Sequence, residues 1–189
     1  MEIAGVVLAA GAGRRYGMPK ALAPYQGSLL VHRAAGTLRA AGVTETVVVV
    51  GAQAERVRAV APELTCVENP DWATGMASSL RAGLAAVAAG PAGAAVVLLV
   101  DMPGVTPAAV RAIAAHASPD ALVMGGYGER RSHPVLLGRE HWAGVARSAT
   151  GDRGARDYLR AHAAQVIVVP VGDVADDTDL DEPTVASRA

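Results

Sequence analysis

The chain has 189 residues, of which 51% are apolar, with a mean hydropathy of +0.27 and a formal net charge of −1. This length and composition predict one folded domain with a sizeable core and exclude a disordered chain, and the near-neutral charge argues against a nucleic-acid-binding surface. The single cysteine, Cys66, excludes an intramolecular disulfide and a multi-cysteine metal site. The chain has no basic leader and no apolar stretch near ~20 residues, so we expect a cytoplasmic protein without a membrane span.

Apolar runs alternate along the chain with stretches of helical apolar spacing. The runs predict strands at Ile3–Ala10, Thr46–Val50, Leu64–Val67, Ala94–Val100, Ala121–Met124, Val135–Leu137 and Val166–Val171. The helical spacing covers Leu30–Ala41, Glu55–Ala61, Ala77–Ala88, Pro107–Ala117, Glu140–Ser148 and Ala155–Ala163. Thr106 before Pro107 is a typical helix start, and Gly42 is a typical helix end. The alternation predicts an α/β fold, with a mostly parallel sheet covered by helices on both faces, in a single domain over residues 1–189.

The first predicted strand runs into a glycine-rich loop, LAAGAGRRYGMPKAL, that spans Leu8 to Leu22. Glycines there let backbone N–H groups approach an anion closely. A dinucleotide fingerprint requires glycine where Tyr16 stands, and the second strand lacks an acidic residue at its end, which argues against an NAD site. A P-loop requires Gly-Lys-Ser/Thr, whereas Lys20 lies between Pro19 and Ala21. The loop therefore fits neither common phosphate-binding template.

The loop carries the only lysine of the chain, because the 17 basic residues comprise sixteen arginines and Lys20. An ammonium is a compact point charge and a guanidinium is a planar fork, so a position that stays lysine against this bias indicates a need for compactness. With Arg14 and Arg15 close by in the loop, we interpret Lys20 as a contact to a polyphosphate. The alternative is a surface lysine that stands here by chance.

Carboxylates follow the strands at two places. Ligands of open α/β sheets bind beyond the carboxyl ends of the strands, and Asp101 follows the most hydrophobic predicted strand, which makes it a candidate metal ligand. The alternative for Asp101 is a helix cap or a turn. Six of the eighteen acidic residues lie within residues 173–182. One of these would complete a Mg²⁺ site with Asp101, while the alternative is a solvated acidic surface.

Two further stretches have the composition of ligand loops. Residues 69–80 bring small hydroxyls to a helix N-terminus, where the alternative is simple capping by Thr74 or Ser78. Residues 150–156 open a helix with two arginines, which suit a phosphate or else pair with neighbouring aspartates on the surface.

A lone histidine, His133, precedes a proline between a predicted flexible loop, Gly125–Ser132, and a strand. A histidine in such a place is more often a structural hydrogen-bonding group than a catalyst, and both roles stay open for it.

Five motifs together resemble the nucleotidyltransferases that mature the molybdenum cofactor, most closely the molybdenum cofactor cytidylyltransferases. The motifs are Leu8-Ala9-Ala10-Gly11-x-Gly13-x-Arg15-x-Gly17-x-x-Lys20, Gly75-Met76-Ala77-Ser78-Ser79-Leu80, Asp101-Met102-Pro103, His133-Pro134 and Gly151-Asp152-Arg153-Gly154-Ala155-Arg156. The first and third are shared with a wider superfamily that includes sugar-phosphate nucleotidyltransferases, and the other three are narrower. The resemblance spans nearly the whole chain.

The resemblance implies a Rossmann-like, three-layer α/β/α fold of the nucleotidyltransferase type. It implies transfer of CMP from CTP to the terminal phosphate of molybdopterin with release of pyrophosphate, dependent on Mg²⁺ or Mn²⁺, and a molybdoenzyme or its cofactor-insertion chaperone as partner. The implied catalytic residues are Arg15, Lys20 and Asp101, and the implied metal ligands are Asp101 and Asp179. The implied nucleotide-binding residues are Leu8, Ala9, Ala10, Gly11, Ala12, Gly13, Arg15, Lys20, Gly75, Ser78, Ser79 and Asp101. The implied molybdopterin-binding residues are His133, Asp152, Arg153 and Arg156.

The chain departs from the family pattern in its acidic tail. Relatives usually continue Asp-x-Asp-Thr-Pro-Glu-Asp, whereas this chain reads Asp177-Thr178-Asp179-Leu180-Asp181-Glu182-Pro183, so Asp179 is assigned only by its place in the run. At the start of the glycine-rich loop, guanylyl-transferring relatives typically carry Leu-Ala-Gly-Gly, and Ala10 resembles the cytidylyl branch. One methyl group shifts discrimination by only ~1–3 kcal/mol, so GTP stays open as the donor.

Two rival functions remain from the sequence. A sugar-1-phosphate nucleotidyltransferase shares the opening motif, and it would turn over a sugar phosphate without molybdopterin. A non-catalytic factor that binds or inserts the molybdenum cofactor would bind the cofactor without releasing pyrophosphate.

Overall fold

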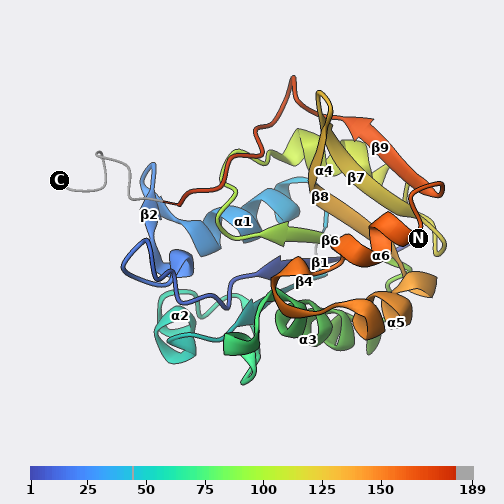
Figure 1. The fold of residues 1–189 in the computed structure, drawn as a ribbon. Coiled ribbons are helices and arrows are strands. Elements are labelled where there is room, and N and C mark those ends of the chain that lie inside the picture. Colours follow the sequence, from blue (N-terminus) through green and yellow to red (C-terminus); the bar gives the residue numbers. More distant parts are fainter. Residues whose placement is uncertain (44, 182–189) are drawn as a thin grey trace.

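The computed structural model describes residues 1–43 and 45–181. Within them, the main sheet has seven strands in the order β5-β4-β1-β6-β8-β7-β9 (Figure 1). The strands are β1 (Ile3–Leu8), β4 (Glu45–Val50), β5 (Thr65–Glu68), β6 (Ala94–Leu99), β7 (Leu122–Tyr127), β8 (Arg130–Gly138) and β9 (Val166–Pro170). All run parallel except β8, which is antiparallel to its neighbours β6 and β7. A separate ribbon pairs β2 (Pro24–Tyr25) with β3 (Ser28–Leu29).

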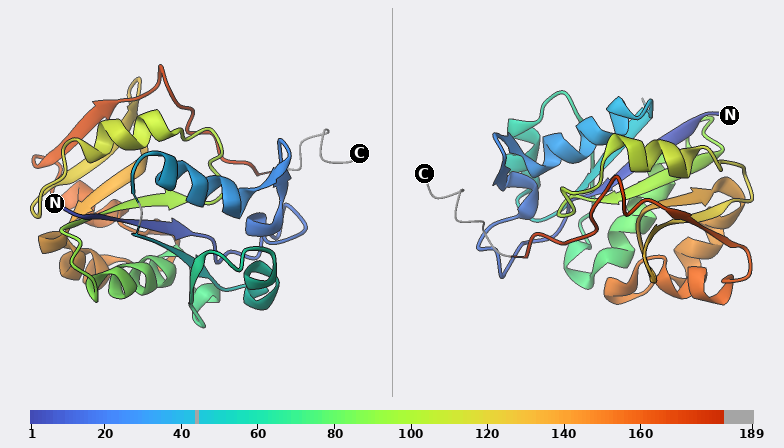
Figure 2. Two further views of the ribbon diagram at one scale, coloured as in Figure 1. Left: turned by 180° about the vertical axis from the view of Figure 1, so that it is seen from behind. Right: turned by 90° about the horizontal axis from the view of Figure 1, so that it is seen from above.

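Helices cover both faces of the sheet, as Figures 1 and 2 show. They are α1 (Leu30–Ala40), α2 (Ala54–Val60), α3 (Met76–Ala88), α4 (Pro107–Ala114), α5 (Arg139–Ser148) and α6 (Arg156–Ala161). Side chains of α1, α2 and α4 join one apolar cluster, and those of α3, α5 and α6 join another. The expected three-layer α/β/α fold with a mostly parallel sheet is therefore confirmed. No helix in the described residues is long and apolar enough to cross a membrane.

The central strands are apolar along their whole length because both of their faces are covered. In β1, Val7 belongs to the cluster of α1, α2 and α4, while Val6 belongs to the cluster on the opposite face. The same alternation places Val48 and Val49 of β4 in opposite clusters. Unbroken apolar runs are typical of parallel strands buried on both sides.

The predicted ends of two helices are confirmed by their capping geometry. The Ala109 N–H donates to Thr106 Oγ1 at 3.3 Å, and Pro107 is the first residue of α4. Gly42, with a φ of +93°, follows the end of α1. Helix α4 ends at Ala114, three residues earlier than predicted, and α6 is also shorter than predicted.

The prediction of a flexible loop over Gly125–Ser132 is wrong. Residues up to Tyr127 continue β7 and residues from Arg130 begin β8, so the two strands form a hairpin with a two-residue turn. The glycines suggested a loop, but β7 is paired on both sides, with β8 and with β9. A Cβ on Gly126 would lie 2.9 Å from Val168 Cγ1, so glycine here permits the close approach of β9.

The carboxyl ends of β1 and β6 meet at one edge of the sheet, since these strands pair in parallel with Leu8 beside Leu99. The chain leaves β1 for β4 on one side, while β6 lies on the other side, so the strand order reverses here. Such a reversal is where open α/β sheets bind ligands. The residues after β9 run along the same edge, where the Leu180 N–H donates to the Asp101 carbonyl oxygen at 2.8 Å.

Candidate active site

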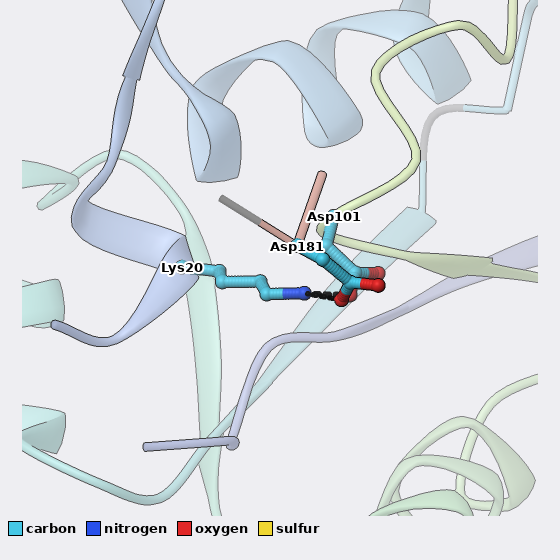
Figure 3. Close-up of polar contacts among 3 residues, drawn as sticks. All are labelled: Lys20, Asp101 and Asp181. Atoms are coloured by element: carbon cyan, nitrogen blue, oxygen red, sulfur yellow. Dashed lines mark hydrogen bonds and ion pairs between the residues drawn. The ribbon is translucent and has the colours of Figure 1, made fainter. Parts of the chain in front are cut away.

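Lys20 lies at this edge in a small cluster of ion pairs. It begins η1 (Lys20–Leu22), a single turn that follows the glycine-rich loop. Its Nζ donates to Asp101 Oδ2 at 2.8 Å and to Asp181 Oδ1 at 3.1 Å (Figure 3). The Lys20 and Asp101 side chains are 16% and 22% exposed, whereas Asp181 is 61% exposed. Two residues singled out from the sequence are therefore in direct contact, and a carboxylate from the acidic tail joins them.

Negative charge exceeds positive charge around Lys20. Burial opposes the charged ammonium, but Asp101 and Asp181 outweigh this effect and raise the pKa of Lys20. Burial, together with the carboxylates of Asp101 and Asp181, raises the pKa of Asp179. Carboxylates that repel one another beside a single ammonium favour a further cation.

The pair Asp101 and Asp179 has the donor chemistry of a Mg²⁺ or Mn²⁺ site. Magnesium in particular is commonly bound by one or two carboxylates and completed by water and substrate phosphates. Within the described part of the chain, no group of three acidic, histidine or cysteine side chains is arranged to hold a metal by itself. The residues present therefore fit a metal whose coordination is completed by water or by a phosphate ligand.

The glycine-rich loop folds back on itself before Lys20. The Gly17 N–H donates to the Gly13 carbonyl oxygen at 2.8 Å, and Gly13 has a φ of +59°. A Cβ on Gly13 would lie 1.8 Å from the Met18 carbonyl oxygen, so a side chain has no room there. Arg14 and Arg15 are exposed and form no ion pair within the described residues, which leaves both guanidinium groups available to an anion.

The two other predicted ligand loops pack against each other at the start of α3. Gly75 has a φ of +113°, and a Cβ there would lie 2.5 Å from the Gly151 carbonyl carbon. The Met76 N–H donates to Asp152 Oδ1 at 3.2 Å. The aspartate thus caps α3 from a distant loop, η3 (Gly151–Arg153), and fixes the position of that loop.

The Ser78 and Ser79 hydroxyls are buried and bonded within the protein. Asn69 Nδ2 donates to Ser78 Oγ at 2.8 Å and to Ser79 Oγ at 3.0 Å, and Ser78 Oγ donates to the Gly75 carbonyl oxygen at 2.9 Å. All three polar side chains are buried. The serine pair therefore holds the loop before α3 in place. Capping of α3 by Thr74 or Ser78 is not observed.

A pocket of about 620 Å³ lies beside this edge, with an apolar floor and a basic rim. Its apolar lining includes Leu8, Leu80, Val97, Met124, Val135 and Leu137. Its lining also includes the arginines Arg130, Arg131, Arg153, Arg156 and Arg160, and the carboxylates of Asp152, Asp177 and Asp179. Pockets of this size and lining bind small molecules, with polar groups at a few fixed points.

His133 lines this pocket as a half-buried hydrogen-bonding group. Its Nδ1 lies 3.0 Å from the Val97 carbonyl oxygen, which requires a proton on that nitrogen. Burial lowers the pKa of His133, although the bond to Val97 and the Asp101 carboxylate oppose this shift. The imidazole is therefore held as a neutral donor, which matches the structural role left open in the sequence analysis.

Residues 5–166 match the MobA-like NTP transferase domain. The chain belongs to the MobA-like NTP transferase family. It is 38% identical to nicotine blue oxidoreductase from Paenarthrobacter nicotinovorans, over 95% of this chain and 92% of that protein. It is 30% identical to Rv0371c from Mycobacterium tuberculosis H37Rv, with a TM-score of 0.79 over 99% of this chain and 96% of that one, and Rv0371c has also been solved in complex with manganese. A Methanothermobacter nucleotidyl transferase shares the fold at 22% identity, with a TM-score of 0.81 over 96% of this chain and 92% of that one.

In this MobA-like chain, the predicted site residues fall into two groups. All four predicted molybdopterin-binding residues, His133, Asp152, Arg153 and Arg156, line the one pocket. The glycine-rich loop with Arg15 and Lys20 lies outside this lining, at the carboxyl end of β1. Leu8 and Asp179 line the pocket, and Asp101 pairs with Lys20, so these residues mark the border between the two groups.

Some of the predicted ligand-binding side chains have protein partners in the structure. Ser78 and Ser79 present no hydroxyl to a ligand, because both are buried against Asn69. Arg153 forms the surface ion pair that the sequence left open, with Arg153 Nε 3.1 Å from Asp157 Oδ2.

The structure brings four further residues to the site that no sequence motif marked. Asp181 lies in an acidic run that the sequence leaves open between a metal ligand and a solvated surface, and Arg130, Arg131 and Arg160 lie outside the recognised motifs. Because arginine is the common basic residue of this chain, a few more arginines close together did not indicate an anion-binding site.

We expect the two glycines of the loop to respond differently to substitution. Gly17 has a φ of +87° with nothing near its missing Cβ, so Gly17→Ala should lower the free energy of unfolding by about 1–2 kcal/mol, the strain of a left-handed residue. In Gly13→Ala, the new Cβ would also overlap with the Met18 carbonyl oxygen. This variant should therefore lower the free energy of unfolding further and weaken nucleotide binding. Urea denaturation of both variants checks this, and equal losses would contradict the predicted role of Gly13.

We expect His133 to make folding stability depend on pH. Its pKa in the folded state lies below the ordinary value of 6.5, so below that pH the unfolded chain takes up a proton that the folded chain resists. The free energy of unfolding should therefore fall as the pH drops below 6.5, and His133→Gln should flatten that slope. Urea denaturation at pH 7.5 and pH 5.5 measures it, with His116→Gln, an exposed histidine, as the control.

Proposed function

We propose that this MobA-like protein transfers CMP from CTP to the terminal phosphate of molybdopterin and releases pyrophosphate, in a Mg²⁺-dependent reaction. The observation that carries the proposal is the two-part site. A basic loop suited to a triphosphate and a large apolar pocket with a basic rim meet at the carboxylates Asp101 and Asp179.

The glycine-rich loop forms the nucleotide half of the proposed site. Arg15 is exposed at the carboxyl end of β1, and Lys20 is held by carboxylates that a metal-bound triphosphate would replace as its partners. A compact ammonium and a flexible guanidinium on one loop suit the β- and γ-phosphates, which carry most of the negative charge of the leaving group. This assigns stabilisation of the departing pyrophosphate to Arg15 and Lys20.

Asp101 and Asp179 would hold the metal. Bound Mg²⁺ neutralises charge on the transferring phosphate. The manganese complex of Rv0371c, a relative 30% identical to this chain, supports a divalent metal in the family.

The reaction balances without a protein nucleophile. A phosphate oxygen of the acceptor attacks the α-phosphorus of CTP in line, the bond from the α-phosphorus to the bridging oxygen of the β-phosphate breaks, and pyrophosphate leaves with that electron pair. The product joins CMP to the acceptor through a new phosphoanhydride bond. Catalysis of this kind depends on positioning and electrostatics, which the loop and the carboxylates provide.

The pocket favours a ring system over a sugar as the acceptor. Its floor is formed by aliphatic and methionine side chains, among them Leu80, Met124 and Leu137, which offer no partner to sugar hydroxyls. Burying an unpaired hydroxyl there would cost about 1–3 kcal/mol, so a sugar-1-phosphate fits poorly. The flat rings of a pterin match the floor, and the arginines match its anionic groups.

A second candidate function is an oxidoreductase that acts on a conjugated ring compound. It is favoured by the 38% identity to nicotine blue oxidoreductase, whose name states an oxidoreductase activity. The same apolar pocket would hold the ring compound, and turnover would consume a reductant such as NADH without any nucleoside triphosphate. The glycine-rich loop, which lacks the dinucleotide fingerprint, favours the transferase.

The direct test combines nucleotide binding with product release. With Mg²⁺, CTP should raise the thermal midpoint more than GTP, and NADH should leave it unchanged, because a ligand at ~100 times its Kd stabilises a protein by about 2.7 kcal/mol. Pyrophosphate should then appear only when CTP and molybdopterin are both present. NADH oxidation with a quinone in the absence of CTP would instead support the oxidoreductase. Cofactor binding without pyrophosphate would support an insertion factor.

Two substitutions test the assigned roles within that assay. Asp101→Asn should abolish Mg²⁺-dependent pyrophosphate release. Lys20→Arg keeps the charge but not the compact ammonium, so it should lower kcat at least tenfold while CTP still stabilises the protein. Full activity in both variants would contradict the site, and Arg39→Gln, on the exposed side of α1, is the matched control.

A further inference from the structure

The segment after β9, residues 172–181, lies along the carboxyl edge of the sheet, and we refer to it as the C-terminal strap (Figure 1). Hydrogen bonds to its backbone dock it at three points. Thr106 Oγ1 donates to the Val174 carbonyl oxygen at 2.8 Å, the Asp176 N–H donates to the Gly104 carbonyl oxygen at 3.1 Å, and the Leu180 N–H donates to the Asp101 carbonyl oxygen at 2.8 Å. The acidic run is therefore an ordered part of the site rather than a solvated tail.

A side-chain ion pair between Arg130 and Asp177 ties the strap to the β7–β8 hairpin. Arg130 Nη2 donates to Asp177 Oδ1 at 2.7 Å. The Asp177 side chain is only 10% exposed, whereas Arg130, at the start of β8, is 73% exposed. Within residues 1–43 and 45–181, Arg130 is the one cation that pairs with Asp177.

This pair differs from an ordinary surface ion pair because the carboxylate of Asp177 is largely buried while its partner Arg130 is exposed. Exposed pairs contribute little, because water solvates each charge when its partner leaves. A carboxylate that is largely withdrawn from water has no such replacement, so loss of its cation leaves an uncompensated charge. Without Arg130, we expect Asp177 to turn toward water and to shift the residues between the Asp176 and Leu180 hydrogen bonds.

Asp179 depends on that position because it lies between two fixed points. Asp177 is held by Arg130 on one side, and the Leu180 N–H is bonded to the Asp101 main chain on the other. The short segment between them places the Asp179 carboxylate in the pocket lining, one residue before the Leu180 N–H that binds the Asp101 main chain. A shift at Asp177 would therefore move Asp179 away from Asp101.

We propose that Arg130 is a positioning residue that acts through Asp177 to hold Asp179 opposite Asp101 for a shared divalent cation. This inference rests on the metal role proposed above for Asp101 and Asp179. It gives a role in the site to the β7–β8 hairpin, which the sequence had predicted to be a flexible loop. Arg130 itself touches neither of these carboxylates in the hydrogen bonds and ion pairs of the described residues.

The test measures the Kd of Mn²⁺ for the full chain by electron paramagnetic resonance. No nucleotide or acceptor is present. Arg130→Gln should raise the Mn²⁺ Kd about tenfold, which is the usual effect of removing a group that orients a metal ligand. Asp177→Asn should weaken it to a similar extent. The double variant should be no worse than either single variant, because both act through one contact. Arg130→Lys, which keeps the cation, should recover part of the affinity.

Amide hydrogen exchange tests whether the Mn²⁺ affinity falls because the strap loosens, and an exposed arginine elsewhere serves as the control. In Arg130→Gln, the Leu180 amide should exchange faster, since its bond to Asp101 depends on the docked strap. Arg147→Gln, an exposed arginine on α5, should change neither readout. Thermal midpoints establish that each variant is folded.

Unchanged Mn²⁺ affinity in folded Arg130→Gln would overturn the proposal, even if stability falls. The same holds if the wild-type protein binds no Mn²⁺, or if Asp101→Asn leaves the Mn²⁺ Kd unchanged, because the shared cation then does not exist. If the Mn²⁺ effects appear but CTP and molybdopterin yield no pyrophosphate, the proposed reaction fails while the positioning role stands.

Discussion

The parallel pairing of β1 with β6 is the constraint on which the site depends. It sets Leu8 beside Leu99, so the chain leaves both strands at the same edge of the sheet, and the loops that carry Lys20 and Asp101 must meet there. The pairing is stabilised by apolar side chains on both faces of each strand, packed against two layers of helices. The chemistry of the site is thus positioned by the core rather than by the loops themselves.

Electrostatic imbalance at this edge links the fold to its function. One ammonium lies among the carboxylates of Asp101, Asp179 and Asp181, and the mutual repulsion of these carboxylates makes the negative charge costly. In the proposed function, a cation and a polyphosphate together would relieve that cost, because the metal would satisfy the carboxylates and the phosphates would satisfy Lys20 and the exposed Arg15. The proposed site is therefore complementary to a metal ion and to a triphosphate.

The apolar pocket decides what else this family member binds. The MobA-like fold is shared with nucleotidyl transferases and with a relative named an oxidoreductase, so the fold by itself does not specify the reaction. The pocket with its aliphatic floor and basic rim serves both candidate functions, because each is proposed to place a ring compound there. The triphosphate loop and the paired carboxylates are what distinguish the transferase.

The sequence alone determined the layer architecture, most element positions and the individual chemistry of Lys20, Asp101 and His133. These follow from local rules, since apolar periodicity reports burial and residue type sets charge and hydrogen bonding. Tertiary structure decided which of these groups meet. Pairing on both sides turned Gly125–Ser132 into a hairpin, and burial against Asn69 turned Ser78 and Ser79 inward. The ion pairs of Asp181 with Lys20 and of Asp177 with Arg130 join residues far apart in the chain, and no local pattern encodes such contacts because they exist only once the sheet has formed.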